Sequence, residues 1–232
     1  MLQTPWWECI AAGLPFLLEP GDTWAIQPPE DYRPGATRDV VLNPLRSRDL
    51  WPVFADCADR VIMYETENML DRACWWRGVS RELRSLCPAL RWWNYSAANA
   101  RVHGDHVRPL RQIHAFPERP ARQRPIDVLF VGSINGRRSD LLSRLRAAGV
   151  AVHCPTVPVF GAALALLESS ARLLLNVHHY VPGVFEAFRV VPALHRGTPV
   201  ISESSTDGEG EQWCAEVPYA ALLETILSAL QG

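Results

Sequence analysis

The sequence predicts an α/β protein with two units, each built around a parallel sheet. Two observations lead to this prediction: short apolar runs alternate with amphipathic stretches of helical length, and the loops between them are short. A third observation, a proline-rich segment near the middle of the chain, separates the two units. Strands and helices that alternate in this way place parallel strands side by side, with helices covering both faces of the sheet.

The second half of the chain carries the clearer pattern. Residues 126–131 form a short apolar run, interrupted by Asp127 alone, which is typical of a parallel strand buried on both faces. Leu141, Leu142 and Leu145 share one face of an amphipathic helix. The expected strands are residues 126–131, 150–154, 172–177 and 198–202, and the expected helices are residues 139–148, 161–170, 185–195 and 219–230.

The first half is less regular, and we expect a reduced α/β unit there. The tryptophan pairs at residues 75–76 and 92–93 are expected in its core, with stacking against a sugar or a base as the alternative. The expected strands are residues 23–27, 39–42, 60–64 and 89–95, and the expected helices are residues 50–58, 71–86 and 96–103.

The boundary between the two units is expected within residues 108–125. This segment holds four prolines, so it can form neither a helix nor a central strand, and we expect one short strand near Ile113 at most. Its arginines form a solvated surface or contact phosphate or nucleic acid, and the sequence leaves both interpretations open. The predicted domains are residues 1–118 and residues 119–232.

The composition excludes several classes of protein. The 232 residues include 23 basic and 25 acidic ones, and this near-neutral charge argues against a general nucleic-acid binder. Every basic residue is an arginine, which excludes Schiff-base chemistry on lysine and the lysine-containing P-loop. No apolar run approaches the ~20 residues of a membrane span. The N-terminus lacks the pattern of a secretory signal. We therefore expect a cytoplasmic protein.

The six cysteines are scattered along the chain, and no two of them form a CxxC pair. This spacing excludes the common zinc and redox motifs, so we expect reduced thiols, no bound metal and no cofactor.

The turn after residues 126–131 suits an anionic ligand. The next helix begins there, and its N-terminus offers unpaired N–H groups and a positive dipole end. Two glycines allow close approach, a serine and an asparagine can donate hydrogen bonds, and two arginines can bind a phosphate. A diphosphate site is one interpretation, and an ordinary tight turn is the other. The candidate residues are Gly132, Ser133, Asn135, Arg137 and Arg138, with Gly136 as the second glycine.

Polar residues also follow the expected strand at residues 172–177. Glu186 and Arg189 are three residues apart, so they share one helix face. They form a simple ion pair, or Glu186 accepts from sugar hydroxyls while Arg189 faces a phosphate. The neighbouring rings of His178 and His179 cannot point the same way, so one of them is structural; His178 is a candidate catalytic residue.

A third polar cluster follows the expected strand at residues 60–64. Glu65 and Glu67 are two residues apart and face the same side only if the strand continues through them. A carboxylate in a cleft can act as a general base or bind hydroxyls. In the alternative interpretation, Thr66 and Asn68 cap a helix and both glutamates are solvated.

Three stretches of the second half resemble the C-terminal half of GT-B-type glycosyltransferases. They read DVLFVGSINGRRSDLLSRLRAAG, ARLLLNVHHYVPGVFEAFRVVPALHRGTPVISE and VPYAALLETI. They are most similar to bacterial glycosyltransferases with the signature FE-x-FR…AL-x-x-G-x-PV-x-SE. The resemblance covers residues 126–230, with a weaker likeness in VIMYETENML and RWWNYSAANA. It implies two Rossmann-like domains in a GT-B-like arrangement, the N-terminal one reduced.

This resemblance implies metal-independent transfer of a sugar from a nucleotide-diphosphate donor, held by the C-terminal domain. The acceptor, held by the N-terminal domain, is a small molecule, a glycan or a protein. The larger retaining group has a Glu-x7-Glu motif, whose positions here are Val184 and Pro192, so Glu186 is the nearby carboxylate. Donor contacts are implied at Gly132, Ser133, Asn135, Arg137, Glu186 and Arg189, and Glu65 or Glu67 would supply a base.

Two other functions compete with sugar transfer. A non-catalytic nucleotide-binding or partner-binding module derived from the same fold would release no sugar from a donor. An oxidoreductase with a dinucleotide-binding domain would need a GxGxxG motif and an acidic residue after its second strand, and the sequence has neither.

Overall fold

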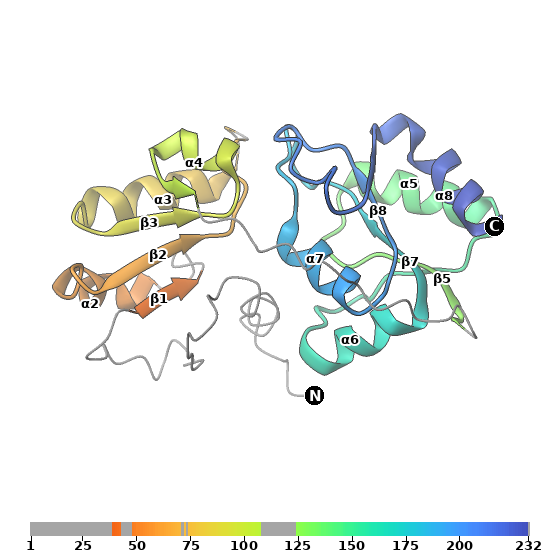
Figure 1. Ribbon diagram of the computed structural model, residues 1–232, viewed down its shortest axis with the longest axis horizontal. Helices are drawn as coiled ribbons and strands as arrows, with labels where there is room; N and C mark the ends of the chain where they lie inside the picture. The colour runs from red at the N-terminus through yellow and green to blue at the C-terminus, as the bar shows by residue number, and fades with distance from the viewer. Residues whose placement is uncertain (1–38, 43–47, 71, 73, 108–123, 232) are drawn as a thin grey trace.

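The computed structural model describes residues 39–42, 48–70, 72, 74–107 and 124–231. In these ranges the chain forms two parallel sheets, which lie side by side along the long axis of the molecule (Figure 1). We call residues 39–107 the N-terminal unit and residues 124–231 the C-terminal unit. The predicted α/β class with parallel sheets is confirmed. The predicted domain boundary at residue 118, the strand near Ile113 and the strand at residues 23–27 lie outside the described residues.

The N-terminal unit contains a four-stranded sheet in the order β1-β2-β3-β4. The predicted helices and the last three predicted strands of this half are confirmed, all but β1 with shifted ends. A two-residue strand has no periodicity to reveal it, so β4 was not predicted. The strands are β1 (Asp39–Leu42), β2 (Val61–Glu65), β3 (Arg91–Asn94) and β4 (His106–Val107), and the helices are η4 (Arg48–Leu50), α2 (Trp51–Asp56), α3 (Trp75–Leu86) and α4 (Ala97–His103).

Alternate residues of β2 point to opposite faces of the sheet and pack in two different hydrophobic clusters. Val61 and Met63 pack with Trp92 and with the side chains of α2 and α3, whereas Tyr64 belongs to the cluster that includes α7 of the C-terminal unit. Trp76 is also buried in the first core, but Trp75 is 59% exposed. The tryptophans are therefore core residues only in part.

The C-terminal unit contains a five-stranded parallel sheet in the order β6-β5-β7-β8-β9. All four predicted strands and all four predicted helices of this half are present, all but α6 with shifted ends, and β9 is an additional edge strand. The strands are β5 (Ile126–Leu129), β6 (Val152–His153), β7 (Ala171–Asn176), β8 (Val200–Glu203) and β9 (Ala215–Val217), and the helices are α5 (Gly136–Ala147), α6 (Gly161–Ser170), α7 (Ala187–His195), η5 (Tyr219–Ala221) and α8 (Leu222–Gln231).

The start of α5 differs from the prediction in a way that matters for the candidate arginines. The helix begins at Gly136 rather than at residue 139, because the Asn135 side chain accepts a hydrogen bond from the Arg138 N–H and caps the helix. Arg137 and Arg138 therefore lie in the first turn of the helix and not in a loop. Their side chains are positioned by helical geometry, which the turn interpretation did not anticipate.

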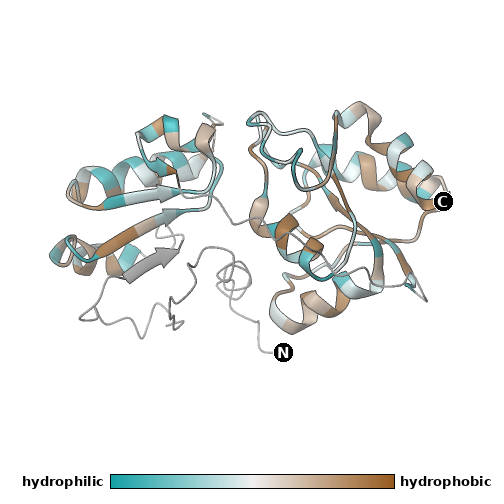
Figure 2. Ribbon diagram, in the orientation of Figure 1, coloured by the Kyte–Doolittle hydropathy of each residue, from teal (hydrophilic) through white to brown (hydrophobic). Residues whose placement is uncertain are grey.

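Helices cover both faces of the C-terminal sheet (Figure 1). Val128 and Phe130 pack with the side chains of α5 and α8, and Leu129, between them, packs with those of α7. The two-residue period of a strand produces this division. The strands are accordingly apolar on both sides, and most of β7 and β8 is brown in Figure 2.

The chain reverses direction across the C-terminal sheet at β5. It crosses from β5 to β6 on one side and then returns to β7 on the other side of β5. In open α/β sheets, such a switch point leaves a crevice at the carboxyl ends of the strands, where ligands bind. Gly132 follows β5 and His178 follows β7, so both lie at this point.

The two units contact each other through α7. The Phe188 ring packs edge-on against Tyr64 and Tyr95, with centroid separations of 5.9 and 5.7 Å. In the part of the chain that the structure describes, no helix combines the length and the apolar character that a membrane span requires.

Candidate functional site

A cavity of about 1240 Å³ lies at the carboxyl ends of the strands. Its volume exceeds the roughly 300–1,000 Å³ of a typical small-molecule pocket, so it has room for a large ligand or for two ligands. Both units contribute to its walls. The lining includes Gly132, Ser133, Arg138, His178, His179, Glu186 and Arg189 from the C-terminal unit, and Thr66, Glu67, Asn68 and Tyr95 from the N-terminal unit.

The start of α5 presents a surface suited to an anion. Gly132 and Ser133 are exposed at the cavity wall, and the first N–H groups of the helix have no intrahelical partner. A Cβ atom at Gly132 would lie 3.3 Å from the guanidinium groups of both Arg138 and Arg189. Two positive charges therefore converge on the glycine that follows β5.

Arg138 links the two loops of the switch point. Its guanidinium is almost fully buried, and Nη1 and Nε donate to the carbonyl oxygens of Ser133 at 2.8 Å and Val177 at 2.9 Å. Burial lowers the pKa of Arg138 to about 10, which the charge of Glu186 opposes. Arg138 therefore stays positively charged at neutral pH while it holds the loops after β5 and β7 together.

Arg137 and Asn135 bind other parts of the C-terminal unit and do not face the cavity. The Arg137 guanidinium forms a two-fold ion pair with Glu203 and stacks over the Tyr219 ring at 3.9 Å. The hydrogen bond with Glu203 raises the pKa of Arg137. Asn135 Nδ2 donates to the backbone oxygen of His179 at 3.0 Å. Neither side chain is among those that line the cavity.

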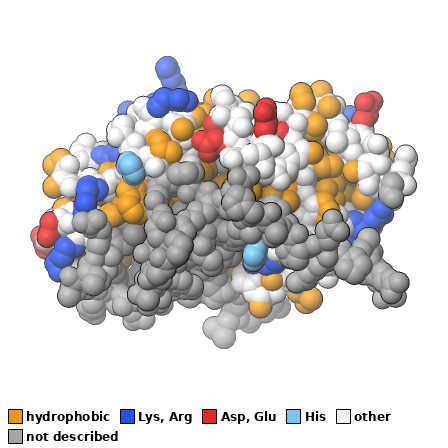
Figure 3. All heavy atoms as spheres, in the orientation of Figure 1, with side chains coloured by type: hydrophobic (Ala, Val, Ile, Leu, Met, Phe, Trp, Pro, Cys, Tyr) orange, Lys and Arg blue, Asp and Glu red, His pale blue; other side chains and the backbone are white. Residues whose placement is uncertain are grey.

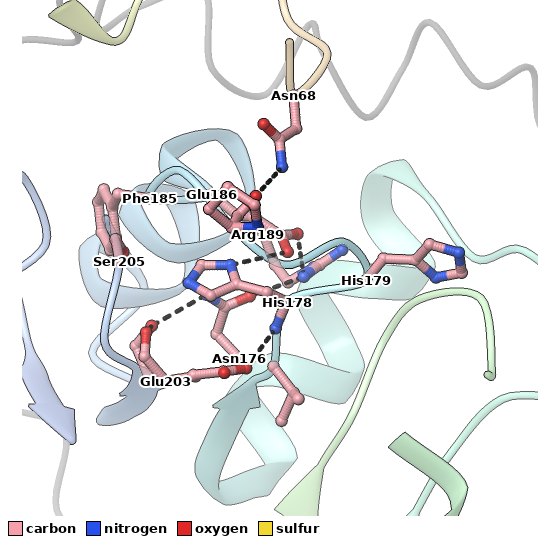
Figure 4. A network of polar contacts seen from close by, with 12 residues as sticks. Asn68, Asn176, His178, His179, Phe185, Glu186, Arg189, Glu203 and Ser205 are labelled. Atoms are coloured by element: carbon pink, nitrogen blue, oxygen red, sulfur yellow. Dashed lines mark hydrogen bonds and ion pairs between the residues drawn. The ribbon is translucent and has the colours of Figure 1, made fainter. Parts of the chain in front are cut away.

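Glu186 and Arg189 form more than a surface ion pair (Figure 4). Arg189 also donates to Asn176 Oδ1 at 2.7 Å, and Asn176 is itself fixed by Ser202 at 3.0 Å. The second carboxylate oxygen of Glu186 lies 3.4 Å from Arg138 Nη2. This arrangement fixes Arg189 at the cavity wall and places Glu186 between two guanidinium groups.

The charge of Glu186 is stabilised by these neighbours. Burial opposes ionisation, but Arg189, a hydrogen bond from His178 and the charge of Arg138 together lower its pKa to about 2. The side chain remains 25% exposed, so it is open to the cavity. Glu186 is therefore an ionised acceptor of hydrogen bonds that a ligand can reach.

His178, in the loop after β7, contacts the carboxylate of Glu186. Its ring Nδ1 lies 3.6 Å from Glu186, its backbone N–H donates to Glu203 at 3.0 Å, and Gly183 packs directly on the ring. Among the described residues, its buried Nε2 has no hydrogen-bond partner. His179 contacts Arg138 Nη1 at 3.4 Å, and burial with this nearby charge lowers the pKa of His179.

The structure separates Glu65 from Glu67. The strand β2 ends at Glu65, so the two side chains do not share one face. Glu65 is fully buried; one of its oxygens accepts the Glu67 N–H at 2.9 Å, and the other has no partner in the described part of the chain. Burial raises the pKa of Glu65 to about 8. Glu67 lines the cavity, and Glu65 does not.

Tyr95 and Asn176 are residues of the candidate site to which the sequence analysis assigned no role. Tyr95 follows β3 and lines the cavity, and burial raises its pKa well above its ordinary value. Asn176 ends β7 and fixes Arg189. The rule that polar residues after a parallel strand meet at the sheet edge could have identified both.

Charged and metal-ligating side chains are spread out over the part of the chain that the structure describes. On the face shown in Figure 3, charges of both signs are scattered over the described surface. Within the described residues, no three His, Cys, Asp or Glu side chains come close enough together to hold a metal ion. The metal independence of the predicted reaction stays a prediction.

Comparisons with known proteins find distant likenesses among solved structures alone. No family model matches the chain, and neither does any curated protein. One similar solved structure is described as "Crystal Structure Analysis of the Glycotransferase of kitacinnamycin". It has 10% sequence identity and a TM-score of 0.37 over 83% of this chain and 67% of that chain. A likeness of this degree assigns no activity to the chain, so the functional argument rests on the geometry of the cavity.

Proposed function

We propose that the chain is a GT-B-like glycosyltransferase that transfers a sugar from a nucleotide-diphosphate donor to an acceptor in the same cavity. One observation supports this proposal above all: an ionised, reachable Glu186 lies between Arg138 and Arg189 beside the N-terminus of α5. A nucleotide-sugar carries hydroxyl groups next to a diphosphate. The carboxylate suits the hydroxyls, and the helix N-terminus with the arginines suits the diphosphate.

The donor diphosphate would lie over Gly132 and Ser133. The exposed backbone there allows close approach, and Arg189 supplies a fixed guanidinium at the same place. Arg138 adds positive potential from behind the loop. As the sugar departs, the charge that develops on the leaving diphosphate faces these fixed dipoles, which stabilise it without a bound metal. Arg137 and Asn135 hold this framework in position.

The acceptor would approach from the N-terminal unit. Its hydroxyl oxygen attacks the anomeric carbon of the sugar, the bond from that carbon to the diphosphate oxygen breaks, and the nucleoside diphosphate departs. We assign the role of proton acceptor to Glu67, because it lines the cavity on that side. Glu65 is less suited to this role, since burial keeps it largely protonated at neutral pH. His178 would act by holding Glu186.

A thermal-shift panel of UDP, GDP, ADP, dTDP and CDP tests the nucleotide site. A ligand at 100 times its dissociation constant stabilises the folded state by roughly 2.7 kcal/mol. The nucleotide that binds is then titrated into Arg189→Ala, with the exposed Asp140→Asn as a control. The proposal expects weaker binding in the first variant only. If none of the five nucleotides stabilises the protein, the donor site is wrong.

A non-catalytic binding module is the second candidate, and one observation favours it. The position of the second glutamate in the retaining motif is Pro192, which lines the cavity. Release of free sugar from the corresponding nucleotide-sugar distinguishes the two functions, because an active transferase hydrolyses its donor slowly. Nucleotide binding without any sugar release would favour the binding module.

A further inference from the structure

Residues 204–210 of the C-terminal unit contact the N-terminal unit at the start of α4. Asp207 Oδ2 accepts a hydrogen bond from Ser96 Oγ at 2.7 Å, and Glu209 Oε1 accepts one from the Ala97 N–H at 2.8 Å. The first N–H groups of a helix lack intrahelical partners. Side chains of one unit therefore satisfy polar groups at a helix start of the other.

Asp207 takes part both in this contact and in a hydrogen bond beside the cavity-lining Glu186. Its two carboxylate oxygens lie 3.2 and 3.3 Å from the Phe185 nitrogen, whose N–H they accept. Phe185 directly precedes Glu186. The carboxylate that contacts Ser96 therefore also holds the backbone next to the ionised carboxylate of the cavity.

The loop around Asp207 is fixed by its own unit as well. The Thr206 N–H donates to the Gly183 oxygen at 2.8 Å, and Ser205 donates to Glu216 through both its N–H and its hydroxyl. A side chain at Gly210 would overlap Glu216 and the Phe185 ring. This packing leaves the loop little room to move independently of residues 183–186.

We propose that Asp207 is a positioning residue that couples contact between the two units to the placement of Glu186. While the units are in contact, Ser96 holds Asp207 and Asp207 holds the Phe185 amide. When the units separate, Asp207 loses its partner in the N-terminal unit, and the start of α7 is held less firmly. The importance of Glu186 rests on the proposed function, but the coupling itself does not.

Hydrogen exchange at single amides tests the coupling without any ligand. Ser96→Ala removes the contact to Asp207 from the N-terminal unit and leaves every group of the C-terminal unit in place. Losing a hydrogen bond to a charged group is expected to raise the exchange rate of the Phe185 amide about tenfold. Ser80→Ala is the matched control, since Ser80 is a buried serine that accepts from Arg84 within the N-terminal unit. Ser96→Thr keeps the hydroxyl and should restore slow exchange.

The coupling is wrong if Phe185 exchanges at the wild-type rate in Ser96→Ala. Ser96 also caps α4, so Ser96→Ala could speed exchange by loosening that helix. A second variant separates this effect from the coupling. Asp207→Ala lies in the other unit and should raise exchange both at Phe185 and in the first turn of α4. Faster exchange at Phe185 alone would make Asp207 a local cap of its own unit and would overturn the proposal.

Nucleotide binding then connects the coupling to the site. The nucleoside diphosphate that most stabilises the wild-type protein is titrated into the same variants, and we expect about tenfold weaker binding in Ser96→Ala and no change in Ser80→Ala. If Phe185 exchanges faster in Ser96→Ala but the two variants bind with equal affinity, the coupling stands and the role of Glu186 in donor binding is wrong. If no nucleoside diphosphate binds the wild-type protein, the proposed function fails and the exchange rates alone decide the coupling.

Discussion

The carboxyl ends of the two sheets each carry a glutamate, and the two have opposite ionisation states. Glu65 ends β2 and is fully buried, and its one hydrogen-bond partner among the described residues is a backbone N–H. Glu186 borders the cavity and contacts Arg189, Arg138 and His178. Burial raises the pKa of Glu65 to about 8, whereas the cationic neighbours lower that of Glu186 to about 2.

The difference teaches that position at a sheet edge does not determine the charge of a carboxyl group. Both glutamates are near the carboxyl ends of parallel strands, and burial penalises the charge of both. Of the two, only Glu186 has positively charged neighbours close enough to offset the cost of desolvation. It is therefore the glutamate that can bind a ligand as an anion at neutral pH, and the following predictions test this contrast.

Replacing Arg138 should have the largest effect. Arg138→Ala removes the guanidinium that donates to the Ser133 and Val177 carbonyls, and with it one positive neighbour of Glu186. Breaking a buried charged network of this kind costs about 3–5 kcal/mol, so we expect a drop of that order in the free energy of unfolding by urea. A loss below about 1 kcal/mol would mean that Arg138 does not hold the switch point together.

Replacing Glu65 should change how stability depends on pH. Its folded pKa of about 8 lies above the ordinary 4.5, so the folded state holds its proton more tightly. Its contribution to stability is complete below pH 4.5 and is lost as the pH rises towards 8, by about 1.4 kcal/mol per pH unit.

Glu65→Gln removes this loss, because glutamine has no proton to release. Urea unfolding at several pH values between 5 and 8 should show the variant gaining stability relative to the wild type as the pH rises. A constant difference between the two proteins would show that Glu65 does not titrate in this range.

Replacing Glu186 should affect ligand binding. Glu186→Gln removes a charged hydrogen bond to a donor hydroxyl, worth about 1.5–3 kcal/mol, so calorimetric titration with the nucleotide-sugar should show at least about tenfold weaker binding. Its pH effect has the opposite sign to that of Glu65. A lowered pKa adds stability above pH 4.5, and that stability is lost as the pH falls towards 2. Unchanged affinity would assign Glu186 to the scaffold.

Replacing Asp140 should have the smallest effect. Asp140 pairs with Arg144 at 3.7 Å on the solvent face of α5, and both side chains are largely exposed. An exposed pair of this kind contributes about 0.3–0.5 kcal/mol, so Asp140→Asn should barely change urea unfolding or nucleotide affinity. A large effect on affinity would show that nucleotide binding responds to any charge on α5. A weaker affinity in Glu186→Gln would then no longer indicate a direct contact between Glu186 and the ligand.

The sequence by itself determined the class of fold and most of its elements. Two patterns show this: the apolar run at residues 126–131 and the helical spacing of Leu141, Leu142 and Leu145. Hydrophobic periodicity is a property of the local sequence, so it can be recognised without the tertiary structure. The sequence also brought Gly132, Glu186 and Arg189 into one hypothesis, because the carboxyl ends of parallel strands meet at one sheet edge.

Only the tertiary structure decided what each charged side chain does. Arg137 and Arg138 are adjacent in sequence, yet one pairs with Glu203 and the other is buried between two loops. Glu65 and Glu67 are two residues apart, yet only Glu67 lines the cavity. The partners that decide these roles come from segments distant in sequence, and charge, burial and pKa depend on such partners rather than on local pattern.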